Sequence, residues 1–157
     1  MLLRKISNSY RSKNSYIGLF SRLIDSSIED YSYLSHFCVI RNTKIGKFTS
    51  IGEGVKIGLG IHPTDFFSTS PIFYTKSSVF KNSYLKSDTF NSRKKTIIGN
   101  DVHIGANVFI IDGIKIGDGA IIGAGSIVTK ASSPPINFNA PRLTQGKSMA
   151  VSSNLAS

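Results

Sequence analysis

An aliphatic residue followed by glycine returns every six residues in two parts of this 157-residue chain. The first series is Ile45-Gly46, Ile51-Gly52 and Ile57-Gly58, and the second is Ile98-Gly99, Ile104-Gly105, Ile116-Gly117 and Ile122-Gly123. The fourth residue after each isoleucine is small or β-branched, as at Thr49, Val55, Val102 and Val108. A period of six fits neither an amphipathic helix nor a single amphipathic strand, so it describes a larger repeating unit.

Hexapeptide periodicity predicts an all-β fold, the parallel β-helix, in which each hexad forms a short strand and a turn and three hexads form one coil. We expect each glycine to permit the backbone angles of a corner. A weaker form of the pattern begins at Ile17-Gly18, so we expect about five coils between Ser15 and Ser133. The expected domains are an N-terminal segment (1–14), the β-helix (15–133) and a divergent, flexible C-terminal tail (134–157).

The hexad register is lost between Ile57 and Ile98, because 41 is not a multiple of six. Residues 62–95 are therefore expected to leave the shaft as a long loop, and such loops are uncommon without a function. The loop carries several aromatic residues, which either hold a sugar ring or pack the loop onto a neighbouring subunit; packing is the favoured interpretation. It also carries a basic cluster: Lys76, Lys81, Lys86, Arg93, Lys94 and Lys95.

The net charge of +10 is compatible with solvated lysines, or with attraction of a phosphate-bearing cofactor, an anionic glycan or the inner surface of a membrane. No nucleic-acid reader motif is recognisable, so we expect no nucleic-acid partner and at most peripheral membrane contact. Cys38 is the only cysteine, which excludes an internal disulfide. The lack of a signal peptide and of any apolar run near ~20 residues leads us to expect a cytoplasmic protein.

The segment 57–74, which reads IGLGIHPTDFFSTSPIFY, resembles the hexapeptide-repeat acyltransferases, in particular the branch of xenobiotic acetyltransferases and polysaccharide O-acetyltransferases. Residues 98–107 and 116–130 share the resemblance, which extends over about residues 17–130. It implies left-handed coils and a homotrimer with active sites between subunits. It also implies direct acetyl transfer from acetyl-CoA to an acceptor hydroxyl, with no metal.

By this resemblance, His62 matches the catalytic histidine of the family. Acyl transfer needs a base that removes the proton of the acceptor hydroxyl, and an imidazole, with an ordinary pKa of about 6.5, suits this task. Asp65 either orients His62, as the third member of a triad does, or caps a turn. The residues alone leave these two roles open.

The resemblance also implies a groove for the cofactor. Ala106 and Ala124 would offer backbone contacts to the pantetheine arm, or they are ordinary corner residues. Thr129 and Lys130 match a pair that contacts the cofactor in the family. After Lys130 the chain departs from the family pattern, and the turn that helps to bind the nucleotide end is not recognisable. Either Arg142 and Lys147 replace it, or cofactor affinity is reduced.

The resulting expectation is an acetyl-CoA-dependent O-acetyltransferase acting on a sugar or on a glycan precursor such as an O-antigen or capsule unit. The alternatives are an antibiotic acetyltransferase and a catalytically inactive trimeric scaffold. A zinc hydratase of the γ-carbonic-anhydrase kind shares the fold but needs three converging histidines. The chain's three histidines, His36, His62 and His103, are widely separated, so no metal is expected.

Overall fold

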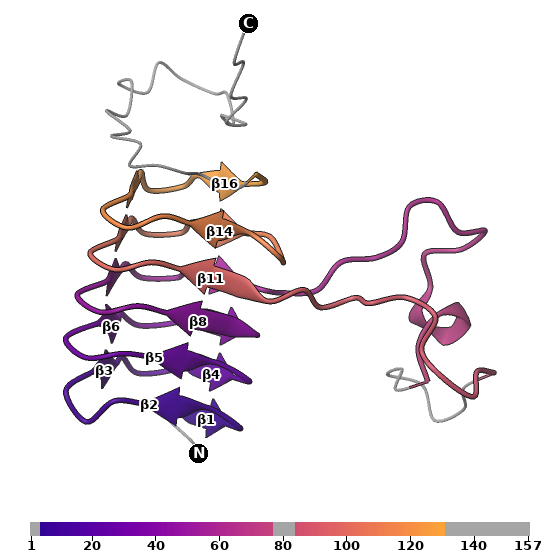
Figure 1. The fold of residues 1–157 in the computed structure, drawn as a ribbon, viewed down its shortest axis with the longest axis horizontal. Helices are drawn as coiled ribbons and strands as arrows, with labels where there is room; N and C mark the ends of the chain where they lie inside the picture. Colours follow the sequence, from indigo (N-terminus) through magenta and orange to yellow (C-terminus); the bar gives the residue numbers. More distant parts are fainter. Residues whose placement is uncertain (1–3, 77–83, 131–157) are drawn as a thin grey trace, which may run out of the picture.

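The computed structural model describes residues 4–76 and 84–130, which form an all-β parallel β-helix with one long loop projecting from it (Figure 1). Strands of two or three residues stack into three parallel sheets of six, five and five strands. All of the strand pairings are parallel, in agreement with the expected left-handed β-helix.

The strands repeat in sets of three along the chain, so each sheet collects every third strand. The first sheet contains β1 (Lys5–Ser7), β4 (Arg22–Ile24), β7 (Val39–Arg41), β10 (Lys56–Ile57), β13 (Phe109–Ile110) and β16 (Ile127–Val128). The second contains β2 (Tyr10–Arg11), β5 (Ser27–Ile28), β8 (Thr43–Ile45), β11 (Thr96–Ile98) and β14 (Lys115–Ile116). The third contains β3 (Tyr16–Ile17), β6 (Tyr33–Leu34), β9 (Ser50–Ile51), β12 (His103–Ile104) and β15 (Ile121–Ile122).

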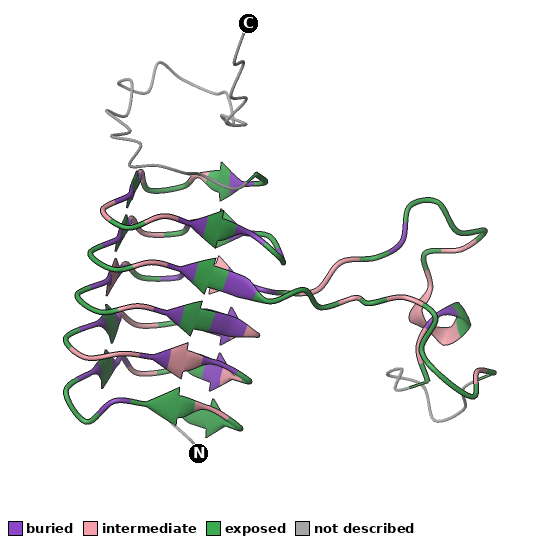
Figure 2. Ribbon diagram, in the orientation of Figure 1, coloured by how far each residue is buried: buried purple, intermediate pink, exposed green. Residues whose placement is uncertain are grey.

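The isoleucines of the hexads form the core of the shaft, as their spacing predicts. Ile45 pairs in register with Ile28 below and Ile98 above, and all three side chains are buried. Burial of one such side chain stabilises the fold by about 1.5–3 kcal/mol, and each level repeats the contribution. The alternation of buried and exposed positions along the strands is visible in Figure 2.

A second inward position, four residues after each isoleucine, carries hydroxyls in the earlier coils and aliphatic side chains in the later ones. Ser32 is an example of such a hydroxyl. The backbone N–H of Thr49 donates to Ser32 Oγ at 2.9 Å, and Ser32 Oγ donates to the Gly46 carbonyl at 2.7 Å. Cys38 also faces inward, and desolvation by burial raises the pKa of its thiol. These hydroxyls satisfy backbone groups of the following coil, so polar side chains are tolerated inside the shaft.

The shaft begins earlier than the expected boundary at Ser15, and its coil count differs slightly from the expected five, because the first sheet has six strands and the other two have five each. β1 pairs with β4 through Lys5↔Arg22 and Ile6↔Leu23, so residues 5–11 belong to the β-helix. Arg11 stands in the register position of Ile28, and Ile6 remains 43% exposed at the uncovered end. The terminal level therefore lacks the buried aliphatic repeat that marks the others. The expected boundary at 133 and the tail at 134–157 lie outside the described residues.

Close stacking of the coils, not an unusual backbone angle, requires glycine after most of the isoleucines. A Cβ atom on Gly46 would lie 2.4 Å from the carbonyl oxygen of Gly99, and one on Gly105 would lie 2.5 Å from the nitrogen of Ala124. Neither glycine has a positive φ, whereas Gly58, where the loop begins, has a φ of 69°. Our expectation about corner angles is therefore wrong for Gly46 and Gly105 and holds at Gly58.

The loop leaves the shaft after β10 and returns at β11, as the broken register predicts (Figure 1). Its two ends run side by side, and the backbone N–H of Ile61 donates to the Ser92 carbonyl at 2.9 Å. The loop contains the short 3-10 helix η1 (Pro71–Phe73). Aromatic contacts hold it together, among them Phe66 with Phe90 at a centroid distance of 5.8 Å and Phe67 with Phe73 at 5.0 Å. These contacts lie within the loop, so packing of the aromatic residues onto a neighbouring subunit stays a prediction.

Candidate active site

The base of the loop is tied to the shaft by Asp112, which follows β13. Its Oδ2 accepts a hydrogen bond from the backbone N–H of Gly60 at 2.9 Å. The Asp112 side chain is only 6% exposed, and its Oδ1 atom has no hydrogen-bond partner among the described residues. Asp118, at the corresponding position of the next hexad, is exposed. The hydrogen bond to the buried Asp112 carboxylate therefore ties the loop to the shaft at Gly60, two residues before His62.

His62 is held in one orientation through its Nδ1 atom, which lies 2.8 Å from the Thr69 carbonyl oxygen and 2.8 Å from the Tyr74 hydroxyl oxygen. A carbonyl oxygen can only accept, so the arrangement assigns the proton to Nδ1. The Nδ1–H group then donates to Thr69 and to the Tyr74 oxygen. In the neutral ring the other nitrogen, Nε2, then carries no proton, which is the form that a general base requires.

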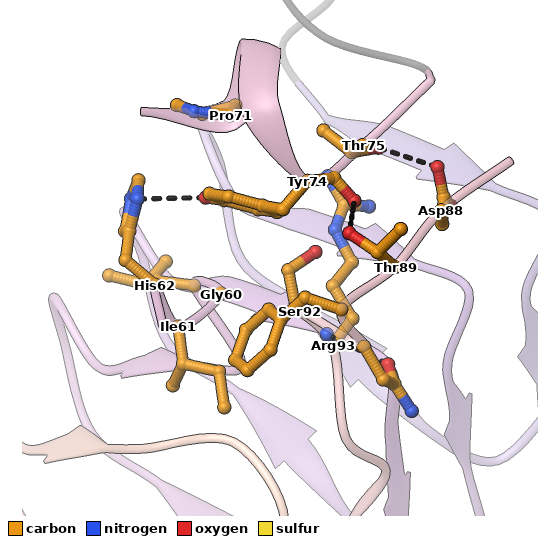
Figure 3. A pocket seen from close by; sticks show the side chains of 13 residues that line it. Gly60, Ile61, His62, Pro71, Tyr74, Thr75, Asp88, Thr89, Ser92 and Arg93 are labelled. Atoms are coloured by element: carbon orange, nitrogen blue, oxygen red, sulfur yellow. Dashed lines mark hydrogen bonds between the residues drawn. The ribbon is translucent and has the colours of Figure 1, made fainter. Parts of the chain in front are cut away.

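Tyr74 is a rigid part of this arrangement, because its side chain is 2% exposed. Its ring packs edge-on against His62 at a centroid distance of 6.1 Å and against Phe90 at 5.5 Å. Its backbone carbonyl accepts from the Thr89 N–H at 2.9 Å, which joins the outgoing and returning parts of the loop. Figure 3 shows the Tyr74 hydroxyl directed at the His62 ring.

A cavity of about 850 Å³ lies within the loop, and His62 forms part of its wall (Figure 3). Among the described residues of its lining, Arg93 is the one lysine or arginine and Asp88 is the one carboxylate. Asp88 accepts from the Lys76 backbone N–H at 2.7 Å and from Thr75 Oγ1 at 2.9 Å, and these bonds lower the pKa of its carboxyl. The remaining lining is polar and aromatic: Leu59, Gly60, Ile61, Pro71, Tyr74, Thr75, Thr89, Phe90, Asn91 and Ser92.

The structure does not bring Asp65 to His62. Asp65 is exposed, and among residues 4–76 and 84–130 no hydrogen bond joins the two side chains. Thr69 and Tyr74 occupy the Nδ1 atom that an orienting carboxylate would contact, because the chain folds back after Phe67 and presents a carbonyl instead.

The expected cofactor residues fall into two groups at opposite ends of one strand. Ala106 and Ala124 lie one above the other in the turns after β12 and β15, where the Gly125 N–H donates to the Ala106 carbonyl at 2.8 Å. Thr129 and Lys130 follow β16 and are exposed. Ile57, Ile110 and Val128 share one register position, and the loop leaves the shaft directly after Ile57. Thr129 and Lys130, which come directly after Val128, therefore lie over the corner from which the loop leaves. Both groups therefore flank the same sheet.

Sequence reasoning missed Tyr74 and Asp112 as parts of the site. Tyr74 is twelve residues from His62, and no periodicity relates the two. In the sequence, Asp112-Gly113 looks like an ordinary corner of the β-helix. Only the structure shows that the loop covers Asp112 and buries its carboxylate. Among the residues that the structure describes, no group of three or more His, Cys, Asp or Glu could hold a metal ion. Within the same residues, no helix has the length and apolar character needed to cross a membrane.

Residues 95–130 match a known family, described as bacterial transferase hexapeptide (six repeats). This part of the chain is a hexapeptide repeat. No curated protein matches the chain as a whole.

The fold is similar to that of solved acetyltransferases. A hexapeptide-repeat acetyltransferase from Vibrio cholerae O1 biovar eltor, in complex with acetyl-CoA, superposes with a TM-score of 0.51 at 20% identity, over 84% of this chain and 62% of that one. A galactoside acetyltransferase in complex with coenzyme A superposes with a TM-score of 0.47 at 25% identity, over 85% of this chain and 57% of that one. A polysialic acid O-acetyltransferase superposes with a TM-score of 0.48 at 16% identity, over 86% of this chain and 76% of that one. The chain thus spans less than two thirds of the length of the Vibrio protein.

Proposed function

We propose that this protein is an acetyl-CoA-dependent O-acetyltransferase that acts on a hydroxyl of a sugar or of a surface-polysaccharide unit. One observation carries the proposal. His62 lies on the wall of a cavity, its Nδ1 atom is engaged by Thr69 and Tyr74, and Nε2 has no hydrogen-bond partner among the described residues. A histidine held in this way is prepared to remove a proton from a group bound in the cavity.

The chemistry assigned to the chain is a single proton relay. Bound acetyl-CoA would supply an acetyl thioester. His62 Nε2 takes the proton of the acceptor hydroxyl as its oxygen forms the new bond to the acetyl carbon, and the same proton then passes to the departing thiolate. The Thr69 carbonyl and the Tyr74 oxygen lie against Nδ1–H, where they stabilise the imidazolium formed between these two transfers.

The residues of the later coils are compatible with a slim ligand. Ala106 and Ala124 place only methyl groups on their shared corner, which leaves room for a slim ligand beside the backbone. Lys130, exposed above the corner where the loop leaves, can meet a phosphate as a point charge. We assign both groups to the cofactor, and we place the reaction in the cytoplasm.

We further propose that the active unit is a homotrimer. His62 is exposed on the single chain, and a site that excludes water from the thioester would need further cover. A second copy packed against the loop would supply it and would place the active site between two subunits.

Calorimetric titration with acetyl-CoA of the wild type and of His62→Ala tests the proposal, followed by transfer assays with sugars and with an antibiotic acceptor. We expect both proteins to bind acetyl-CoA and only the wild type to acetylate a sugar. Acetylation of the antibiotic alone would replace the acceptor class. Failure of both proteins to bind acetyl-CoA would overturn the proposal and favour a catalytically inactive scaffold.

A further inference from the structure

The cavity beside His62 contains a guanidinium without a partner among the described residues. Arg93 is the one basic residue on its lining, and its guanidinium forms no hydrogen bond or ion pair with any residue in the described ranges. We infer that the acceptor carries an anionic group, a carboxylate or a phosphate, which Arg93 binds while the reacting hydroxyl lies at His62. This inference rests on the proposed function and specifies its substrate class.

The backbone of Arg93 is well anchored although its side chain is exposed. Its carbonyl accepts from Asn42 Nδ2 of the shaft at 3.3 Å, and its N–H donates to Asn91 Oδ1 at 3.1 Å. The preceding Ser92 carbonyl accepts from Ile61 N–H, one residue before His62. His62 and Arg93 therefore stand on the two adjacent ends of the loop, at fixed backbone positions on one cavity.

The acidic residue of the cavity does not form an ion pair with Arg93 in the described parts of the chain. Asp88 already accepts two hydrogen bonds, from Thr75 Oγ1 and from the Lys76 backbone N–H, and no ion pair joins it to Arg93. Loop residues 59–95 contain six basic and two acidic residues, so the surrounding field also favours an anion. The net positive charge of the loop therefore raises the local concentration of anionic ligands around the cavity.

The rest of the lining suits a sugar ring that bears this charge. Ser92, Thr89 and Asn91 offer hydroxyl and amide groups to ring hydroxyls, while Phe90, Tyr74 and Pro71 offer apolar faces. The planar guanidinium of arginine matches a carboxylate or phosphate through two parallel hydrogen bonds, which a lysine cannot reproduce. The arrangement therefore fixes the position of an acidic sugar at one end and exposes a hydroxyl at the other.

The test uses three probes with one ring and different groups at C6: methyl β-D-glucoside, methyl β-D-glucuronide and methyl β-D-glucoside 6-phosphate, together with the corresponding galactosides. Binding is measured by calorimetry and ligand-observed NMR in the absence of acetyl-CoA. We expect the wild type to bind at least one anionic probe about tenfold or more tightly than its neutral counterpart, a preference that salt weakens. The stronger of the two anionic probes identifies carboxylate or phosphate as the natural group.

Arg93→Gln should abolish this preference, and Arg93→Lys should restore only part of it. Lys86→Gln is the matched control, because it removes the same charge from the loop outside the cavity lining. Equal binding of neutral and anionic probes, an unchanged preference in Arg93→Gln, or an equal loss in Lys86→Gln would each overturn the inference. So would a loss of acetyl-CoA affinity in Arg93→Gln with sugar binding unchanged. Acetyl transfer to neutral sugars without any anionic preference would leave the proposed function standing and refute this inference alone.

Discussion

Asp112 Oδ2 accepts the backbone N–H of Gly60 at 2.9 Å, and this bond joins the shaft to the loop two residues before His62. Asp112 follows β13 and Gly60 follows β10, and these strands are neighbours in one sheet. The carboxylate is buried where the loop leaves, so it positions the loop without touching the acceptor. Asp112 is therefore a positioning residue.

Asp112→Ala should lower kcat of acetyl transfer and reduce stability, because the Gly60 N–H loses its hydrogen-bond acceptor, a change worth about 1–3 kcal/mol. Asp112→Asn should recover most of both losses, since its amide oxygen still accepts from Gly60. The measurements are steady-state kinetics and chemical denaturation. Asp118→Ala, at the equivalent exposed corner, serves as the control for activity. An Asn variant as impaired as the Ala variant would argue against the positioning role.

His62→Ala should reduce acetyl transfer by about 10²–10⁴-fold, the usual contribution of a general base, with acetyl-CoA binding retained. Tyr74→Phe removes one of the two oxygens at Nδ1 and should reduce kcat by about three- to tenfold, the effect of one hydrogen bond. Tyr10→Phe, on an exposed shaft residue, should leave the rate unchanged. Equal rates in the Tyr74 and Tyr10 variants would remove Tyr74 from the site.

Gly46→Ala should destabilise the shaft by about 1–3 kcal/mol or more, because the new methyl group would overlap the Gly99 backbone. Gly119→Asn provides the contrast, since a Cβ there meets nothing within 4 Å and asparagine tolerates the φ of 69°. Urea unfolding of both variants measures the difference. Similar losses at the two positions would mean that coil stacking does not set the glycine requirement.

Burial raises the pKa of the Cys38 thiol, chiefly by desolvation, above its usual value of 9.0. The folded protein therefore keeps this proton to a higher pH than the unfolded chain does. The contribution to the free energy of unfolding is fully present below about pH 9 and is lost as pH rises through the folded-state pKa. Cys38→Ser should lack this loss, which denaturation at neutral and alkaline pH will measure. The native thiol should also react much more slowly with a thiol reagent than the unfolded chain, because the thiolate is the reactive form.

Much of the shaft could be predicted from residues alone, because each buried isoleucine stacks on equivalents one coil away and the six-residue spacing records that contact directly. Ile45, Ile51 and Ile57 are all buried, and the break after Ile57 marks the loop. The first level was missed because Arg11 and the uncovered Ile6 interrupt the pattern there. A hydrophobic period can be recognised in the sequence only where the repeated position is buried in the fold.

The sequence by itself determined the β-helix, the place of the loop and His62 as the candidate base. Only the tertiary structure decided which groups surround that base. Thr69 and Tyr74 rather than Asp65 meet Nδ1, Asp112 supports Gly60, and Arg93 reaches the same cavity from the far end of the loop. The physical reason is that the shaft is built from contacts between neighbouring repeats, whereas the site depends on one irregular loop whose residues meet at separations that follow no period.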